Sequence, residues 1–257
     1  MLPLTRRRQH AIDVVTDLVV REFRLRYRRS VLGWVWAIAQ PLARLLILSF
    51  VFTRILPLHI DDYGVFLFTG LIGWSWFAAA VSTATSSAID RADLLFRPGL
   101  PRAVVPVVSV LTDAIDYLAA LPVLAVFLLL GPGIPATTLI LPAILVVQLL
   151  LILGIGFASC AANVYMRDVR LLIDTGLLLG FYLTPVFYAP SSVPDRYSAV
   201  VTLNPMAQLL IAQRDVLVEG RLPGLVPFFV LTVVSMATFV AGYAVYRAVS
   251  PTFVDEL

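Results

Sequence analysis

Three stretches of this chain carry no charged residue for far longer than the roughly 18 apolar residues that mark a membrane-crossing helix. They run from Tyr63 to Ile89, from Tyr117 to Met166 and from Leu222 to Tyr246. Inside a bilayer only helices and closed β-barrels satisfy their backbone hydrogen bonds, and barrel strands alternate polar and apolar residues over about ten positions. No such alternation is present, so the sequence predicts an all-α integral membrane protein.

The apolar pattern predicts six membrane-spanning helices. We expect them near residues 31–55, 63–88, 103–130, 136–162, 171–189 and 223–247. The connection 190–222 is the longest and contains many apolar residues, with Asn204-Pro205 as a helix start, which predicts short re-entrant helices before the last span. The chain thus divides into an N-terminal segment, 1–30, and a six-helix transmembrane domain, 31–257.

Residues 10–29 have the pattern of an amphipathic helix. Ile12, Val15, Val19 and Phe23 recur at helical spacing, while the arginines of this segment gather on another face. One interpretation is an interfacial helix that the anionic cytoplasmic leaflet attracts, and the other is a positive flank that orients the first span. Both predict a cytoplasmic N-terminus.

Arginine placement predicts the orientation of the chain. With the N-terminus inside, most arginines fall in the N-terminal segment and in the loops on the same side of the membrane. The positive-inside rule then places both termini in the cytoplasm, which requires an even number of spans.

The chain contains no lysine. A phosphate-binding P-loop needs a lysine before Ser or Thr, so any ATP hydrolysis must take place on another polypeptide. We therefore expect a transport subunit and not an enzyme, with no cofactor and no metal on this chain.

A few charged residues lie inside the predicted spans, where each costs about 2.5–3.5 kcal/mol on insertion scales. Arg44 follows Pro41 in the first span, and Asp113 and Asp116 share one face of the third. One interpretation is an interhelical ion pair between Arg44 and a carboxylate. Another is a binding site in which Arg44 meets an anionic head group such as a diphosphate. A catalytic carboxylate pair is a third alternative, but no histidine lies in a span to support it.

Aromatic residues form two clusters that could serve packing or transport. The candidates for a transport pathway are Trp74, Trp76, Phe77, Tyr182 and Tyr188. Belt and packing roles suit such residues, because a ring with a polar group fits the membrane interface. Rings that face a pore would instead pack on the apolar faces of sugar rings.

The segment 86–102, between the second and third spans, carries both signs of charge. Its charged residues include Asp90, Arg91, Asp93 and Arg97. It is either a solvated loop or a short element that docks on a cytoplasmic partner.

The sequence resembles the polysaccharide-export branch of the ABC-2 type permeases, which handle O-antigens, teichoic acids and galactan. The strongest local match is Arg26-Tyr27-Arg28-Arg29-Ser30-Val31-Leu32-Gly33-Trp34-Val35-Trp36-Ala37-Ile38-Ala39-Gln40-Pro41-Leu42, and Tyr165-Met166-Arg167-Asp168-Val169 and Leu203-Asn204-Pro205-Met206 add to it. The layout of the whole chain agrees as well.

This resemblance implies a homodimer in the bacterial inner membrane that pairs with two copies of an ATPase subunit, which would bind ATP and Mg. The implied substrate is a polyprenyl-diphosphate-linked polysaccharide. The residues implied to contact the ATPase are Arg24, Arg28, Asp90, Arg91, Asp93 and Arg97. Two alternatives remain open, namely a permease for a drug or small lipid and a membrane-embedded transferase for polyprenyl lipids.

Overall fold

The computed structural model describes residues 4–27, 33, 35–55, 57, 60–95 and 100–256, and these residues form helices and connecting loops without strands. The long helices are α1 (Leu4–Tyr27), α2 (Val35–Phe50), α3 (Tyr63–Asp90), α5 (Val104–Leu130), α6 (Leu141–Tyr165), α7 (Asp168–Leu183), α9 (Pro205–Leu217) and α10 (Leu225–Val249). The short helices are α4 (Ala92–Leu95), α8 (Ser198–Thr202) and α11 (Phe253–Glu256). A π-helical turn, Val51–Ile55, extends α2, and 3-10 turns lie at Ala136–Ile140, Pro190–Ser192, Asp195–Tyr197 and Ser250–Thr252.

Among the described residues, five helical segments are long and apolar enough to cross a membrane, which confirms the all-α membrane fold. They cover Ile38–Ile55, Tyr63–Asp90, Val104–Leu130, Ala136–Tyr165 and Leu225–Thr252. Helix α7 has 16 residues, about 24 Å at 1.5 Å per residue, which is shorter than the roughly 30 Å hydrocarbon core. The count of six spans therefore stays a prediction.

Helix α7 ends six residues before the expected boundary, and the cause is a proline. The next residue, Thr184, has φ −92° and ψ 138°. This extended conformation is the one that a following proline, here Pro185, imposes on its neighbour. The expected span 171–189 is thus corrected to a helix that starts at Asp168 and ends at Leu183.

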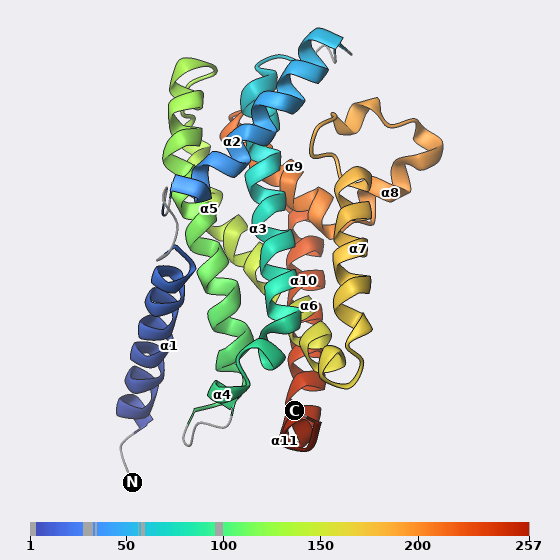
Figure 1. Cartoon of the computed structure of the whole chain (residues 1–257). Coiled ribbons are helices and arrows are strands. Elements are labelled where there is room, and N and C mark those ends of the chain that lie inside the picture. Colours follow the sequence, from blue (N-terminus) through green and yellow to red (C-terminus); the bar gives the residue numbers. More distant parts are fainter. Residues whose placement is uncertain are drawn as a thin grey trace.

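Helix α3 forms the centre of the bundle, between α2, α5, α6, α7 and α9 (Figure 1). In the apolar window of α3, 78% of the residues are buried, against 6% in Ile38–Ile55, which covers most of α2 and the π-helical turn. Helix α2 therefore lies at the outside of the bundle, and few of its described side chains are fully buried.

Helices α6 and α10 cross through glycines. A Cβ atom at Gly242 would collide with the backbone carbonyl of Gly154, so only glycine permits this approach. Small residues at helix crossings are typical of membrane bundles, where close backbone packing replaces the hydrophobic driving force.

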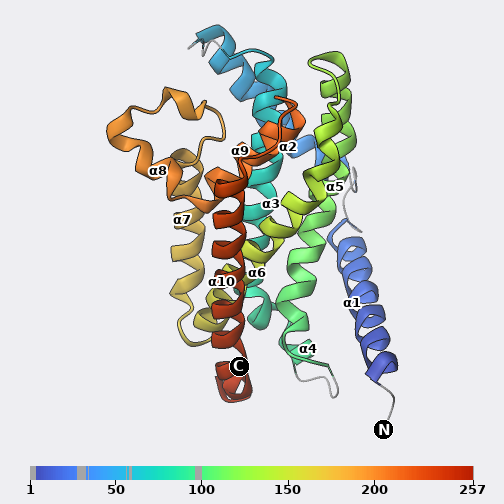
Figure 2. The ribbon, with the colours of Figure 1, turned by 180° about the vertical axis from the view of Figure 1, so that it is seen from behind.

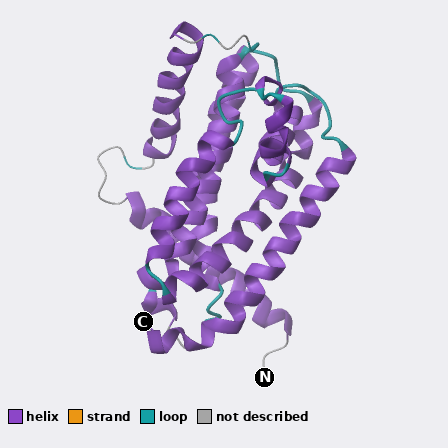
Figure 3. Cartoon of the chain, turned by 90° about the vertical axis from the view of Figure 1, so that its right-hand side faces the viewer, coloured by secondary structure: helices purple, strands orange, loops and turns teal. Residues whose placement is uncertain are grey.

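The start of α1 and the end of α11 lie at one end of the bundle, together with α4 and the turn between α6 and α7 (Figure 1). The view from behind shows α1 beside α5 at this end (Figure 2). Figure 3 shows the helices running between the two ends, where the loops gather. Two chain ends on the same side are consistent with a chain that crosses the membrane an even number of times.

The connection before the last span contains helices, as expected, namely the short α8 and the 13-residue α9. Helix α9 begins after Asn204, whose side chain accepts hydrogen bonds from the backbone N–H groups of Met206 (3.0 Å) and Ala207 (3.3 Å). This is the N-cap that Asn204-Pro205 predicts, and Asn204 also donates to Thr184 Oγ1 at 2.9 Å. Most side chains of α9 are buried in the bundle, while its re-entrant position in a membrane stays a prediction.

Candidate functional site

A cavity of about 1190 Å³ opens between α2, α3, α5 and α7, and we name it the charged cavity. Six residues that the sequence singled out line it: Arg44, Trp74, Trp76, Asp113, Asp116 and Tyr182. They come from four helices and were proposed for two separate roles. The fold brings the charged and the aromatic candidates into one space.

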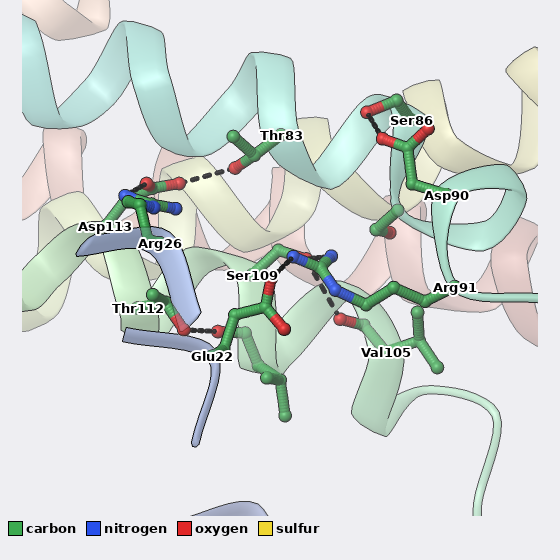
Figure 4. A network of polar contacts seen from close by, with 12 residues as sticks. Glu22, Arg26, Thr83, Ser86, Asp90, Arg91, Val105, Ser109, Thr112 and Asp113 are labelled. Atoms are coloured by element: carbon green, nitrogen blue, oxygen red, sulfur yellow. Dashed lines mark hydrogen bonds and ion pairs between the residues drawn. The ribbon is translucent and has the colours of Figure 1, made fainter. Parts of the chain in front are cut away.

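The two carboxylates of the charged cavity bind an arginine of α1. Arg26 Nη1 lies 2.7 Å from Asp113 Oδ1 and 2.9 Å from Asp116 Oδ2. The Asp113 side chain is only 2% exposed and also accepts a hydrogen bond from Thr83 (Figure 4). This ion pair therefore joins the last turn of α1 to α5 at the wall of the cavity.

The expected pairing of Arg44 with one of these carboxylates is corrected by this geometry. Arg44 Nη1 instead donates to Ser75 Oγ at 3.5 Å. Arg44 lies on α2 opposite α3, whereas α1 packs along α5 and presents Arg26 to the carboxylates. Arg44 is exposed, and its guanidinium is available to an anion that enters the cavity.

A second ion pair fastens α1 one turn earlier. Arg91, at the end of α3, lies 2.7 Å from Glu22 Oε1 of α1 and also donates to Ser109 of α5 (Figure 4). The Arg91 side chain is 16% exposed. Arg91, which the resemblance assigns to ATPase contact, thus connects three helices of this chain.

The other candidates for ATPase contact lie around the same end. Asp90 is exposed and accepts a hydrogen bond from Ser86 Oγ at 2.6 Å. Asp93 is exposed on α4, and Arg24 is exposed on α1. Arg28 and Arg97 lie outside the described residues.

The aromatic candidates divide between two cavities. Trp74 packs edge-on against Phe181, with ring centroids 6.1 Å apart, in the charged cavity. Phe77 and the other side of Trp74 line a smaller cavity of about 290 Å³. Tyr188 lines neither of these cavities, and its hydroxyl donates to the carbonyl of Leu183 at 3.0 Å.

Two buried polar atoms in the wall of the charged cavity have no hydrogen-bond partner among the described residues. They are Nε1 of Trp76 and the hydroxyl of Tyr117, whose rings lie 5.2 Å apart. Buried donors without a partner cost about 1–3 kcal/mol.

Sequence reasoning did not identify Arg214, which is buried in α9 with 4% exposure. Its guanidinium donates to the backbone carbonyls of Phe66 (3.3 Å), Pro185 (2.5 Å) and Val186 (2.7 Å). It also lies 3.6 Å from the centroid of the Phe66 ring. Arg214 thus clamps α9, α3 and the segment after α7 together.

Sequence reasoning also missed the contact of Arg26 with the cavity. The spacing of Glu22 and Arg26, four residues apart on one helix, gave a signal that this face of α1 carries both charges. Their partners belong to other helices and could not be read from that spacing.

The chemistry of the charged cavity suits binding. An exposed arginine, a carboxylate pair held by a second arginine and several aromatic rings share one space. Among the residues that the structure describes, no group of three or more His, Cys, Asp or Glu could hold a metal ion.

Comparisons with known proteins find related sequences over most of the chain. Residues 15–218 match the model of the ABC-2 type transporter family. The chain is 30% identical to an O-antigen export system permease protein RfbA of Myxococcus xanthus over 260 residues, with both chains covered completely. It is 30% identical to an RfbA protein of Klebsiella pneumoniae over 83% of each chain. It is 27% identical to the polysialic acid transport protein KpsM of Escherichia coli over 91% of this chain and 92% of that protein. The chain therefore belongs to the ABC-2 type transporter family.

Proposed function

We propose that the chain is the permease subunit of an ATP-driven exporter that moves a polyprenyl-diphosphate-linked polysaccharide across the bacterial cytoplasmic membrane. Three relatives from three species are named for O-antigen export or polysialic acid transport. The similarity spans nearly the whole chain, including the helices that line the charged cavity. A drug permease or a polyprenyl transferase has no comparable support.

The charged cavity is the single observation that carries this proposal. In this proposal Arg44 binds the diphosphate group of the substrate, because a guanidinium binds phosphate oxygens in a bidentate manner. The rings of Trp74 and Tyr182 offer flat apolar faces for the sugars that follow. A path with both features suits a substrate with an anionic head and a long glycan.

A second copy of the chain would complete the path. Arg44 lies on α2, whose hydrophobic window is 6% buried within this chain. Charged groups in a bilayer normally face protein or water, because facing lipid is costly. A homodimer in which α2 and the charged cavity face the partner copy would shield these groups.

ATP hydrolysis belongs to a separate subunit in this proposal, with ATP and Mg bound there. The end of the bundle that carries both termini, α1 and α4 would face the cytoplasm and this ATPase (Figure 1). The arginines of the segments at this end support that orientation under the positive-inside rule. Movement of α1 would reach the charged cavity through Arg26, because Arg26 binds the two carboxylates there.

The test is export of a lipid-linked glycan by the chain together with its ATPase. Replacing Trp74 and Tyr182 together by Ala should reduce glycan export strongly, because two of the rings that line the path are lost. The matched control is Phe229→Ala on α10, where the ring is 68% exposed and lines neither cavity. Export at the wild-type rate by the double variant, at equal amounts of protein in the membrane, would refute the role of the rings.

A further inference from the structure

The smaller of the two cavities borders α7, and we name it the α7 crevice. It has a volume of about 290 Å³ and is walled by α3, α6, α7 and the start of α9. It shares Trp74 and Leu177 with the charged cavity. The two spaces are therefore neighbours that Trp74 separates.

The lining of the α7 crevice is apolar. Its walls are formed mainly by aliphatic and aromatic side chains, among them Phe77, Val81, Leu151 and Ile155. The two polar side chains at its border, Thr184 and Asn204, already bond to each other at 2.9 Å. Both polar side chains at the border thus already have a hydrogen-bond partner.

The α7 crevice is elongated along the helix axis. Its lining on α7 extends from Leu172 to Gly180, about 12 Å at 1.5 Å per residue. An apolar slot of this volume that runs along a helix suits an extended chain better than a compact ligand.

The surroundings of the α7 crevice are those of a lipid-facing surface. Four leucines of α7 are 58–70% exposed, namely Leu171, Leu172, Leu178 and Leu179. Helix α7 runs beside α3 and α6, at the depth of the long helices (Figures 1 and 2). At this depth the medium is hydrocarbon, which fills an apolar slot without loss of hydrogen bonds.

We propose that the α7 crevice binds an acyl chain of a membrane phospholipid, and that this chain supports Trp74 at the wall of the charged cavity. Two glycines of α7 make the space. A Cβ at Gly176 would meet no atom within 4 Å, whereas a Cβ at Gly180 would lie 3.0 Å from Cη2 of Trp74. The open space at Gly176 holds the chain, and Gly180 allows α7 to reach the indole.

The test is quenching of Trp74 fluorescence by brominated acyl chains. Trp34, Trp36 and Trp76 are replaced by Phe, and the protein is reconstituted in phosphatidylcholine vesicles with or without bromine on the chains. Trp74 is 6% exposed, so lipid at the outer surface alone does not contact it. We expect Trp74 to lose most of its emission in the brominated vesicles.

Filling the crevice provides the decisive comparison. Gly176→Leu should restore the emission, because its side chain occupies the slot, while Gly64→Leu should leave the quenching unchanged. Gly64 is the matched control, since a Cβ there also meets nothing within 4 Å but lies outside the crevice. Unquenched Trp74, or equal quenching in Gly176→Leu, would overturn the proposal.

Two further measurements, photolabelling and competition by polyprenyl phosphate, test the proposal independently. In the chain with all its tryptophans, a phospholipid with a photoreactive acyl chain should label peptides of the crevice, and Gly176→Leu should remove that label. A label that is equal in both proteins contradicts the proposal. Relief of quenching by a small fraction of polyprenyl phosphate would assign the slot to a prenyl chain and reject the phospholipid.

Discussion

The ion pair between Arg26 and Asp113 allows a direct measurement of how firmly α1 docks on the bundle. Arg26→Met and Asp113→Leu, alone and together, form a double-mutant cycle, and Asp116 remains in all four proteins. Each single change removes the 2.7 Å contact, and Arg26→Met leaves a carboxylate that is 2% exposed without its cation. Both single variants should therefore loosen α1.

The expected coupling follows from the geometry. A hydrogen bond to a charged group contributes about 1.5–3 kcal/mol, and Arg26 is 29% exposed, so solvent screens part of this contact. We expect a coupling of about 2 kcal/mol, which corresponds to about a 30-fold change in the opening equilibrium of α1. The double variant should be more stable than the sum of the single effects predicts.

Hydrogen exchange of the α1 amides in lipid nanodiscs measures this opening for each protein. Amides of α6 and α10 serve as the internal reference, since neither helix contains a changed residue. Single effects that add to within about 0.5 kcal/mol would show that the two residues act independently. The docking of α1 through this ion pair would then be wrong.

Two other variants test how the bundle is held together. Arg214→Met should lower the free energy of unfolding in detergent by about 3 kcal/mol, because three backbone carbonyls lose a buried donor. The control Arg221→Met, at a side chain that is 65% exposed, should change this free energy by less than about 0.5 kcal/mol. Equal effects of the two variants would contradict the role of Arg214 in holding the bundle together. Gly242→Ala should lower the midpoint of thermal unfolding markedly, since its Cβ would collide with the carbonyl of Gly154. The control Gly64→Ala should have little effect, because a Cβ there meets no atom within 4 Å. Equal midpoints of the two variants would refute the close crossing of α6 and α10.

The fold class could be read from the sequence because the bilayer leaves few alternatives. Uncharged runs of this length form helices in lipid, and four of the expected spans match long helices closely. The N-cap at Asn204 was also predictable, because a short polar side chain before proline is a local signal. The end of α7 could also have been predicted, because Pro185 disfavours a helical conformation of the residue before it. The expected boundary at residue 189 followed the hydropathy and did not take this proline into account.

The candidate site was only partly predictable. The costly charges Arg44, Asp113 and Asp116 could be recognised as functional or paired, and they do line one cavity. Their partners could not be identified, because ion pairs between helices depend on how the helices pack. Arg26 is separated from Asp113 by 87 positions, and no pattern in the sequence links residues at such a distance.

The clamp at Arg214 recognises main-chain oxygen atoms and not side chains at Pro185 and Val186. Every amino acid supplies the same carbonyl, so this corner keeps its shape while its side chains are free to diverge. Relatives that handle chemically different polymers could thus remodel this corner of the molecule without weakening its anchor.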